Sequence, residues 1–198
     1  MMPNKRLPFI LCFFFLPPLL QAAETVPASE FKVLGISLIE ADITSVRSHL
    51  WDIGGYLQAK GSVKQHNYDK FFPWSTMRDS YYILFRYNHA GKITSVKRLY
   101  RPYSIEQSNR RSAIKTRDVA LPLIQKLGQP TQVQTKGWGG TLRYRAYTWK
   151  DDKVTITIDR EGGEKLGNIF IQYTVHIHDP YEVVNKAPDA QNANPQGV

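Results

Sequence analysis

The sequence predicts an α+β fold of two tandem modules, each a short helix packed on a small antiparallel β-sheet. Two observations carry this prediction. Apolar residues recur at helical spacing in two stretches that end at glycine, and a β-hairpin pattern follows each stretch. We assign residues 31–101 to the first module, 102–115 to a connector and 116–178 to the second module.

The first predicted helix follows Asp42, whose carboxylate can accept hydrogen bonds from the free N–H groups of a first helical turn. The apolar residues after it are three or four apart, which places them on one helix face: Ile43, Val46, Leu50 and Ile53. Gly54 and Gly55 end this helix, because glycine adopts the left-handed cap conformation without a Cβ clash.

Strands surround this helix. Phe31–Ile39 and Tyr56–Val63 are the weaker candidates, and Pro73 restricts Tyr68–Trp74 to an edge strand or a loop. The clearest pattern is Ser80–Arg101, where two alternating runs flank a turn at Asn88–Gly91 and predict a β-hairpin.

The second predicted helix begins near Thr116 or Asp118 and ends at Gly128, with Pro122 in its first turn or at a kink. Its apolar stripe is Val119, Ala120, Leu123, Ile124 and Leu127. Residues Thr135–Thr141 hold three glycines around Trp138 and predict a loop. Three strands follow: Leu142–Trp149, Val154–Arg160 and Asn168–His178.

The two ends of the chain differ in kind from the modules. Lys5 and Arg6 precede the uncharged apolar run Leu7–Gln21, and small residues follow it, a pattern typical of a secretory signal peptide over residues 1–23. We therefore expect a periplasmic or secreted protein of a Gram-negative-type envelope, without a permanent membrane anchor. Residues 179–198 are poor in apolar side chains and predict a disordered tail.

Charge and cysteine content limit the function classes. Removing Lys5 and Arg6 from the 26 Lys and Arg leaves 24 against 17 acids, a surplus of seven positive charges. This surplus favours anionic partners, but an exported protein rarely meets nucleic acid. The single cysteine, Cys12, lies in the signal segment, so the mature chain has no disulfide, cysteine nucleophile or thiolate metal site.

Three short motifs resemble a known kind of module: Leu127-Gly128-Gln129-Pro130, Tyr147-Thr148-Trp149 and the hairpin at Asn88–Gly91. Together with the helix and paired strands, they resemble the small α/β modules of SmpA/OmlA-type envelope proteins and the tandem modules of β-lactamase-inhibitory proteins. The first copy lacks the proline after its glycine, and the lipid-acceptor cysteine and cysteine pairs of such relatives are missing. The resemblance implies a non-enzymatic, protein-binding envelope module, and it does not imply a particular partner.

The sequence offers little that would support catalysis. It has no Gly-x-Ser-x-Gly turn, no phosphate-binding glycine loop and no recognisable carboxylate pair. His176 and His178, two apart on a predicted strand, are the candidates for a shared metal, although such a pair is more often a solvated surface. We predict no cofactor.

Arginine and aromatic residues give the candidate binding surface. These residue types dominate protein-binding hot spots, although tyrosines half-buried under arginines are equally a feature of ordinary sheet faces. The candidates for partner contact are Trp74, Arg86, Arg98, Trp138, Arg143, Arg145 and Tyr147. We expect Trp51 and Trp149 in the core.

The function expected from the sequence is therefore an exported, non-catalytic protein-binding module of inhibitor, immunity or envelope-assembly type. One alternative is a binder of an anionic envelope component such as lipopolysaccharide or a cell-wall polymer. A metal-dependent or serine hydrolase is the other alternative. The protein-binding hypothesis predicts affinity for another envelope protein. The anionic-component hypothesis predicts an affinity that falls steeply as the salt concentration rises.

Overall fold

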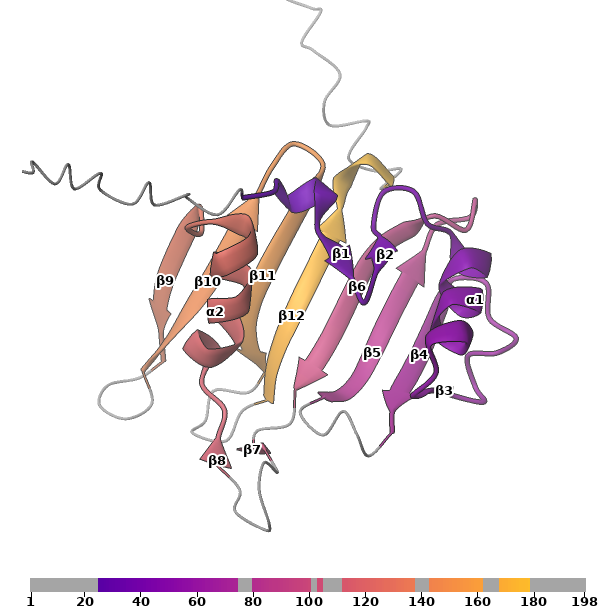
Figure 1. Cartoon of the computed structure of the whole chain (residues 1–198), viewed down its shortest axis with the longest axis horizontal. Helices are drawn as coiled ribbons and strands as arrows, with labels where there is room; N and C mark the ends of the chain where they lie inside the picture. The colour runs from indigo at the N-terminus through magenta and orange to yellow at the C-terminus, as the bar shows by residue number, and fades with distance from the viewer. Residues whose placement is uncertain are drawn as a thin grey trace, which may run out of the picture.

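The computed structural model of this protein describes residues 25–74, 80–100, 103–104, 112–137, 143–161 and 168–178. Figure 1 shows one eight-stranded sheet in the order β3-β4-β5-β6-β12-β11-β10-β9, with every neighbouring pair antiparallel. Its strands are β3 (Tyr56–Gln58), β4 (Tyr68–Pro73), β5 (Ser80–Tyr87), β6 (Ile93–Tyr100), β9 (Gln132–Lys136), β10 (Tyr144–Lys150), β11 (Val154–Glu161) and β12 (Asn168–Val175).

The remaining elements lie outside this sheet. The α-helices are α1 (Ile43–Ile53) and α2 (Thr116–Leu127), and two 3₁₀ turns are η1 (Ala28–Glu30) and η3 (His176–His178). The small two-stranded sheets are β1 (Lys32–Val33) with β2 (Ile36–Ser37), and β7 (Tyr103–Ser104) with β8 (Ser112–Ala113). Figure 1 shows α1, α2 and the β1–β2 hairpin on the same face of the large sheet, which we call the covered face. We call the other side the open face.

The predicted α+β class is confirmed, but the prediction of two separate sheets is wrong. β6 and β12 pair along their length, with Val96 opposite Tyr173 and Leu99 opposite Phe170, so the strands merge into one sheet. The pairing removes two strand edges whose backbone N–H and C=O groups would otherwise need water or another chain. It also joins the apolar side chains beneath α1 and α2 into one core.

The core occupies the covered face, because alternate residues of each strand point toward the helices. Its largest fully buried side chains include Phe85, Ile83, Ile156, Ile158 and Ile171. The N-terminal segment closes the space between the two helices, where the ring of Phe31 stacks on Tyr173 with 5.9 Å between ring centroids.

Helix α1 begins and ends where the sequence predicts. The Asp42 carboxylate accepts from the Ser45 backbone N–H at 2.9 Å, and the Ser45 hydroxyl accepts from the Asp42 N–H at 2.8 Å. Val46 and Leu50 are buried. The expectation that Trp51 lies in the core is wrong, since its side chain is 83% exposed. Consecutive residues of a helix are about 100° apart around its axis, so Trp51 points away from the direction of the buried Leu50 and faces solvent.

Helix α2 is also where we expected it, with Val119, Ala120 and Leu123 buried. Its N-cap residue is Lys115, whose backbone N–H donates to Asp118 at 3.1 Å. Pro122 lies inside the helix and not in its first turn. The indole N–H of Trp149 donates to the Gly128 carbonyl at 2.9 Å, which confirms Trp149 as a core residue and fixes the end of α2 to β10.

Several strand predictions need correction. The single strand predicted at Phe31–Ile39 is a β1–β2 hairpin that turns at Leu34 and Gly35, both with positive φ. β4 lies between β3 and β5, so it is an interior strand and not an edge strand. Pro73 is tolerated because it is the last residue of β4, where its missing N–H interrupts no hydrogen bonding further along the strand. β9 lies partly in the predicted loop 135–141, and the last predicted strand ends at Val175.

Several predicted segments lie outside the described residues: the signal peptide at 1–23, Trp138, the tail at 179–198 and most of the connector 102–115. Among the residues that are described, no helix has both the length and the apolar character needed to cross a lipid bilayer.

The turn between β5 and β6 generates the first prediction. Gly91 has φ of 74°, its carbonyl accepts from Ile43 N–H at 2.9 Å, and a Cβ there would lie 3.2 Å from the Ile43 side chain. Gly91→Ala should therefore lower the free energy of unfolding by about 1–3 kcal/mol in equilibrium urea titrations. Gly61→Ala is the control, because a Cβ added at Gly61 would have no atom within 4 Å, and this change should stay within about 0.5 kcal/mol. Equal effects of the two changes would contradict this account.

Asp151 generates a prediction about pH. Burial acts to raise the pKa of this carboxyl, but the backbone N–H groups of Val154, Lys153 and Ser29 donate to it and lower its pKa overall. A carboxyl whose pKa is lower in the folded state than in the unfolded state, where it is about 3.9, stabilises the fold at pH values above about 3.9. That stabilisation disappears as the pH falls through the pKa of the folded state.

Asp151→Asn should therefore destabilise the protein at pH 7, with a difference that shrinks below about pH 4 in urea titrations. Asp152→Asn, an exposed neighbour in the same turn, should have little effect at either pH. A destabilisation by Asp151→Asn that stays constant with pH would show that the carboxylate charge is not responsible.

Candidate functional site

The described helices lie on the covered face, and the strand register orders the side chains of the open face into rows. Residues directly opposite one another on antiparallel strands point to the same side of a sheet. One row crosses seven strands from β4 to β9: Lys70, Leu84, Lys97, Gln172, Thr157, Thr148 and Gln132.

Two further rows flank it. On one side lie Leu57, Phe72, Tyr82, Leu99, Phe170 and Asp159, and on the other lie Tyr68, Arg86, Ser95, Thr174, Thr155 and Lys150. The half of the open face formed by β3 to β6 is thus aromatic, aliphatic and cationic, whereas the other half consists mainly of threonine and glutamine. Leu99 is buried among its neighbours at the centre of the face.

Lysines on this face lie against aromatic rings. The Lys70 ammonium is 4.2 Å from the centroid of the Tyr82 ring and 5.2 Å from that of Phe72. The Lys97 ammonium is 4.5 Å from the Phe170 ring and also pairs with Glu161. These contacts hold long, flexible side chains against the sheet, so less conformational entropy is lost when a partner covers them.

A polar cluster lies at the end of the face near β9 and β11. Asp159 pairs with Lys136 and accepts from the Tyr144 hydroxyl at 2.9 Å. Burial and the hydrogen bond to Asp159 raise the pKa of Tyr144 to about 12. This phenol therefore remains a protonated hydrogen-bond donor at neutral pH.

The structure separates the residues that the sequence proposed for partner contact. Arg86 is exposed in the third row of the open face, and Trp74 is exposed just after β4. Arg143 and Arg145 are exposed around the start of β10, where the alternation places Arg145 on the same side as Tyr147.

Arg98 and Tyr147 lie on the covered face. Arg98 is opposite Ile83 and Ile171, and its Nε donates to the Ser80 hydroxyl at 2.7 Å. Tyr147 is buried and stacks on Trp149. Successive residues of a strand point to opposite faces of the sheet, so a shift of one residue moves a side chain from one face to the other. The amino-acid composition alone therefore could not show that Arg86 lies on the open face and Arg98 on the covered face.

The two metal candidates make separate contacts. His176 and His178 lie in η3, not on a strand. The His176 Nε2 is 2.7 Å from the Thr155 hydroxyl, and the His178 Nδ1 donates to the Ile93 carbonyl at 2.7 Å. Within the part of the chain that the structure describes, no three metal-ligating side chains form a group.

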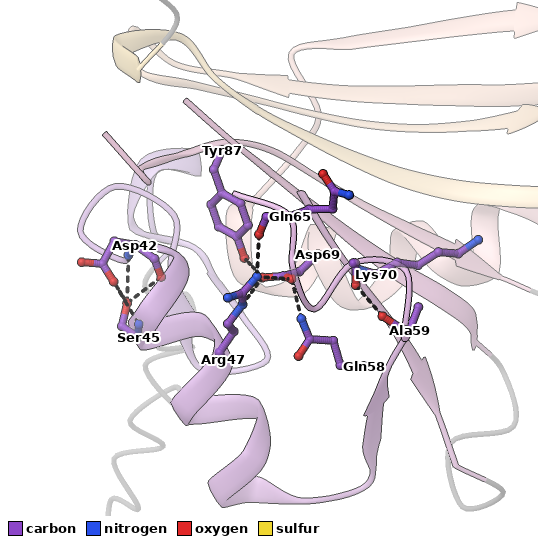
Figure 2. A network of polar contacts seen from close by, with 10 residues as sticks. Asp42, Ser45, Arg47, Gln58, Ala59, Gln65, Asp69, Lys70 and Tyr87 are labelled. Atoms are coloured by element: carbon purple, nitrogen blue, oxygen red, sulfur yellow. Dashed lines mark hydrogen bonds and ion pairs between the residues drawn. The ribbon is translucent and has the colours of Figure 1, made fainter. Parts of the chain in front are cut away.

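A buried polar network on the covered face was missed by the sequence analysis (Figure 2). The fully buried Asp69 carboxylate accepts from Arg47 Nε at 2.8 Å and Arg47 Nη2 at 2.9 Å. It also accepts from Gln58 Nε2 at 2.6 Å and from the Tyr87 hydroxyl at 3.2 Å. Arg47 Nη2 reaches the Gln65 carbonyl at 2.8 Å as well. One signal was available in the sequence. Asp69 is two residues from Phe71 on a predicted strand, so both side chains lie on the same face, and Phe71 faces the core.

This network ties α1 to β3, β4 and β5 through the Asp69 carboxylate. Both carboxylate oxygens of Asp69 already accept two hydrogen bonds each. Burial and the neighbouring Asp69 carboxylate raise the pKa of Tyr87, so its hydroxyl stays a donor. We interpret the network as a structural support behind the open face.

In comparisons with known proteins, no family model matches the chain, and neither a curated protein nor a solved structure is significantly similar to it. Any function must therefore be argued from the surfaces described above.

Asp69→Asn tests this interpretation of the network. Asparagine replaces an acceptor oxygen with an NH₂ group that would face the Arg47 donors, so we expect a loss of about 2–4 kcal/mol in the free energy of unfolding, measured by urea titration. Tyr87→Phe removes one hydrogen bond and should cost about 1 kcal/mol. Asp52→Asn, on the exposed side of α1, is the control and should be nearly neutral. A neutral Asp69→Asn would show that the network does not hold α1.

Proposed function

We propose that this chain is an exported, periplasmic protein that binds another envelope protein through its open face and catalyses no reaction. Inhibition, immunity and assembly are the three forms such binding would take. The observation that carries the proposal is a broad sheet whose described helices all lie on one side, with aromatic and cationic side chains in register on the other.

The size of the open face suits a protein partner. Eight strands about 4.8 Å apart span roughly 34 Å, and three rows of alternate residues extend about 14 Å along the strands, with side chains adding to both. A specific interface buries about 800 Å² on each partner, which a face of this size can supply. Tyr82 and Phe170 are half-buried on either side of the buried Leu99 in one row, and their rings would form its apolar centre.

Five acids among the described residues have structural roles, and this supports binding over turnover. Asp69 holds Arg47, Asp159 holds Lys136, and Glu161 holds Lys97. Asp42 caps α1, and Asp151 accepts three backbone N–H groups. A general acid or base must be within reach of a substrate proton, and these carboxylates are already engaged.

Binding of an anionic envelope polymer is the second candidate, favoured by Arg86 and Lys70 on the open face. Two other lysines of that face, Lys97 and Lys136, are paired with acids. Among the described residues of the face, the cations without an acid partner are therefore Arg86, Lys70 and Lys150, around an apolar centre. This arrangement favours a protein partner over a polyanion. An affinity that falls steeply as salt rises would reverse the preference.

Arg86→Glu tests the proposed surface against a matched change elsewhere. Arg86 is exposed on the open face, and Arg117 is exposed on α2, on the opposite side of the sheet. Using the mature chain as bait in an envelope extract, we expect a stoichiometric partner whose affinity falls at least about tenfold with Arg86→Glu, measured by calorimetry with the purified partner. Arg117→Glu should preserve that affinity.

Two results would count against the proposal. Equal losses with Arg86→Glu and Arg117→Glu would indicate a general charge effect, and unchanged affinity with both would place the contact away from the open face. Phe170→Ala gives an independent arm, since this ring lies at the apolar centre of the face and its loss should also weaken binding.

A further inference from the structure

Exposed apolar side chains concentrate at one edge of the molecule. We use the name edge patch for Trp51, Ile53, Leu57, Val63 and Trp74, whose exposed fractions are 83%, 50%, 59%, 50% and 59%. They lie on α1, β3 and the segments that flank β4, at the margin of the sheet seen on the right of Figure 1. Apolar residues that gather in this way mark an interaction site, whereas scattered ones do not.

Backbone hydrogen bonds bring much of the edge patch together around Gly54 and Gly55. The Gly54 N–H donates to the Trp51 carbonyl at 3.1 Å, and the Trp74 N–H donates to the Gly55 carbonyl at 2.9 Å. Leu57 follows two residues after Gly55 on the edge strand β3. The end of α1, the start of β3 and the end of β4 therefore meet at one corner and present both tryptophans there.

Val63 is held outward by its neighbour in a tight turn. Ser62 is buried, its N–H donates to the Ala59 carbonyl at 2.8 Å, and its hydroxyl accepts from Lys70 N–H at 3.2 Å. Because Ser62 faces inward, Val63 faces solvent between two exposed lysines of the same turn, Lys60 and Lys64.

The charge around the edge patch is mainly positive. Across residues 51–74, Lys60, Lys64 and the stacked Lys70 reach solvent, against a single exposed acid, Asp52. The other acid of this stretch, Asp69, is fully buried and paired with Arg47. Projecting tryptophans and aliphatic side chains among lysines are the combination that binds anionic lipid surfaces, where indole rings lie at headgroup level.

We propose that the edge patch contacts an anionic lipid surface, peripherally and reversibly. A ring as exposed as Trp51 makes few contacts with its own protein and projects from the surface. A fluid headgroup layer adapts to side chains that project from both sides of a sheet edge, whereas a folded partner would need a pocket for each. β3 pairs over only three residues, which leaves little edge for an added strand.

The opposite margin of the sheet provides an internal control. β9 is the other edge strand, and among its residues Val133 is a large exposed apolar side chain. Leu121 on the nearby α2 is exposed as well. The edge patch and the lysines around it share Leu57 and Lys70 with the margin of the open face. The test of the lipid contact changes Trp51, Trp74, Lys60 and Lys64, so a failure there is distinguishable from a failure of the proposed protein partner.

Co-sedimentation with vesicles tests the proposal on the purified mature chain. We expect binding to vesicles of phosphatidylcholine mixed with phosphatidylglycerol and little binding to phosphatidylcholine alone. The double variant Trp51→Ser and Trp74→Ser should lower the affinity at least about tenfold, because it removes two of the largest apolar groups. Lys60→Glu with Lys64→Glu should also lower it and reduce its dependence on salt. Leu121→Ser with Val133→Ser should bind as the parent does.

The outcomes that overturn the proposal are distinct. No binding of the parent to anionic vesicles would reject it, as would equal affinities of the parent and the double tryptophan variant. Binding that both double serine variants weaken alike would indicate a non-specific effect. Dimerisation without lipid that the tryptophan changes abolish, measured by sedimentation velocity, would assign the edge patch to a second copy of the chain instead.

Discussion

The pairing of β6 with β12 is the constraint on which the rest of the structure depends. In each half of the chain a helix precedes four antiparallel strands, and the final strands of the two halves meet at the centre of the sheet. Since one sheet has only two faces, this single pairing places α1 and α2 on a shared core, and the described helices leave the strands of both halves in one continuous face on the other side. The three rows of open-face side chains exist only because the register continues through this central pair.

The covered face supports the open one through polar as well as apolar contacts. Asp69 and Arg47 fix α1 against three strands of one half, and Trp149 fixes the end of α2 in the other. Such buried polar contacts favour one arrangement of helix on sheet, because any displacement leaves a charged or polar group without its partner. A rigid base of this kind suits a surface that binds by shape, since less entropy is lost on association.

The two exposed surfaces differ in chemistry, and we propose different partners for them for that reason. The open face holds Lys70 and Lys97 against aromatic rings and centres on the half-buried rings of Tyr82 and Phe170, which are features of a packed protein interface. The edge patch has tryptophans that project from a corner of the fold, with lysines spaced along the adjoining turn. A protein bound through the first and a lipid surface touched by the second are compatible, because the patch lies at a margin of the sheet.

Local signals were sufficient for the helices and hairpins. Asp42 and the two glycines after Ile53 specify the limits of α1, and Asn88–Gly91 specifies the β5–β6 turn, because caps and turns depend on a few neighbouring residues. Tertiary structure alone decided the partner of β6, the outward position of Trp51, the inward position of Arg98 and the burial of Asp69. Each of these features depends on contacts between residues far apart in the chain, or on which face of a strand packs against the helices. The local spacing of residue types encodes neither the contacts nor the choice of face.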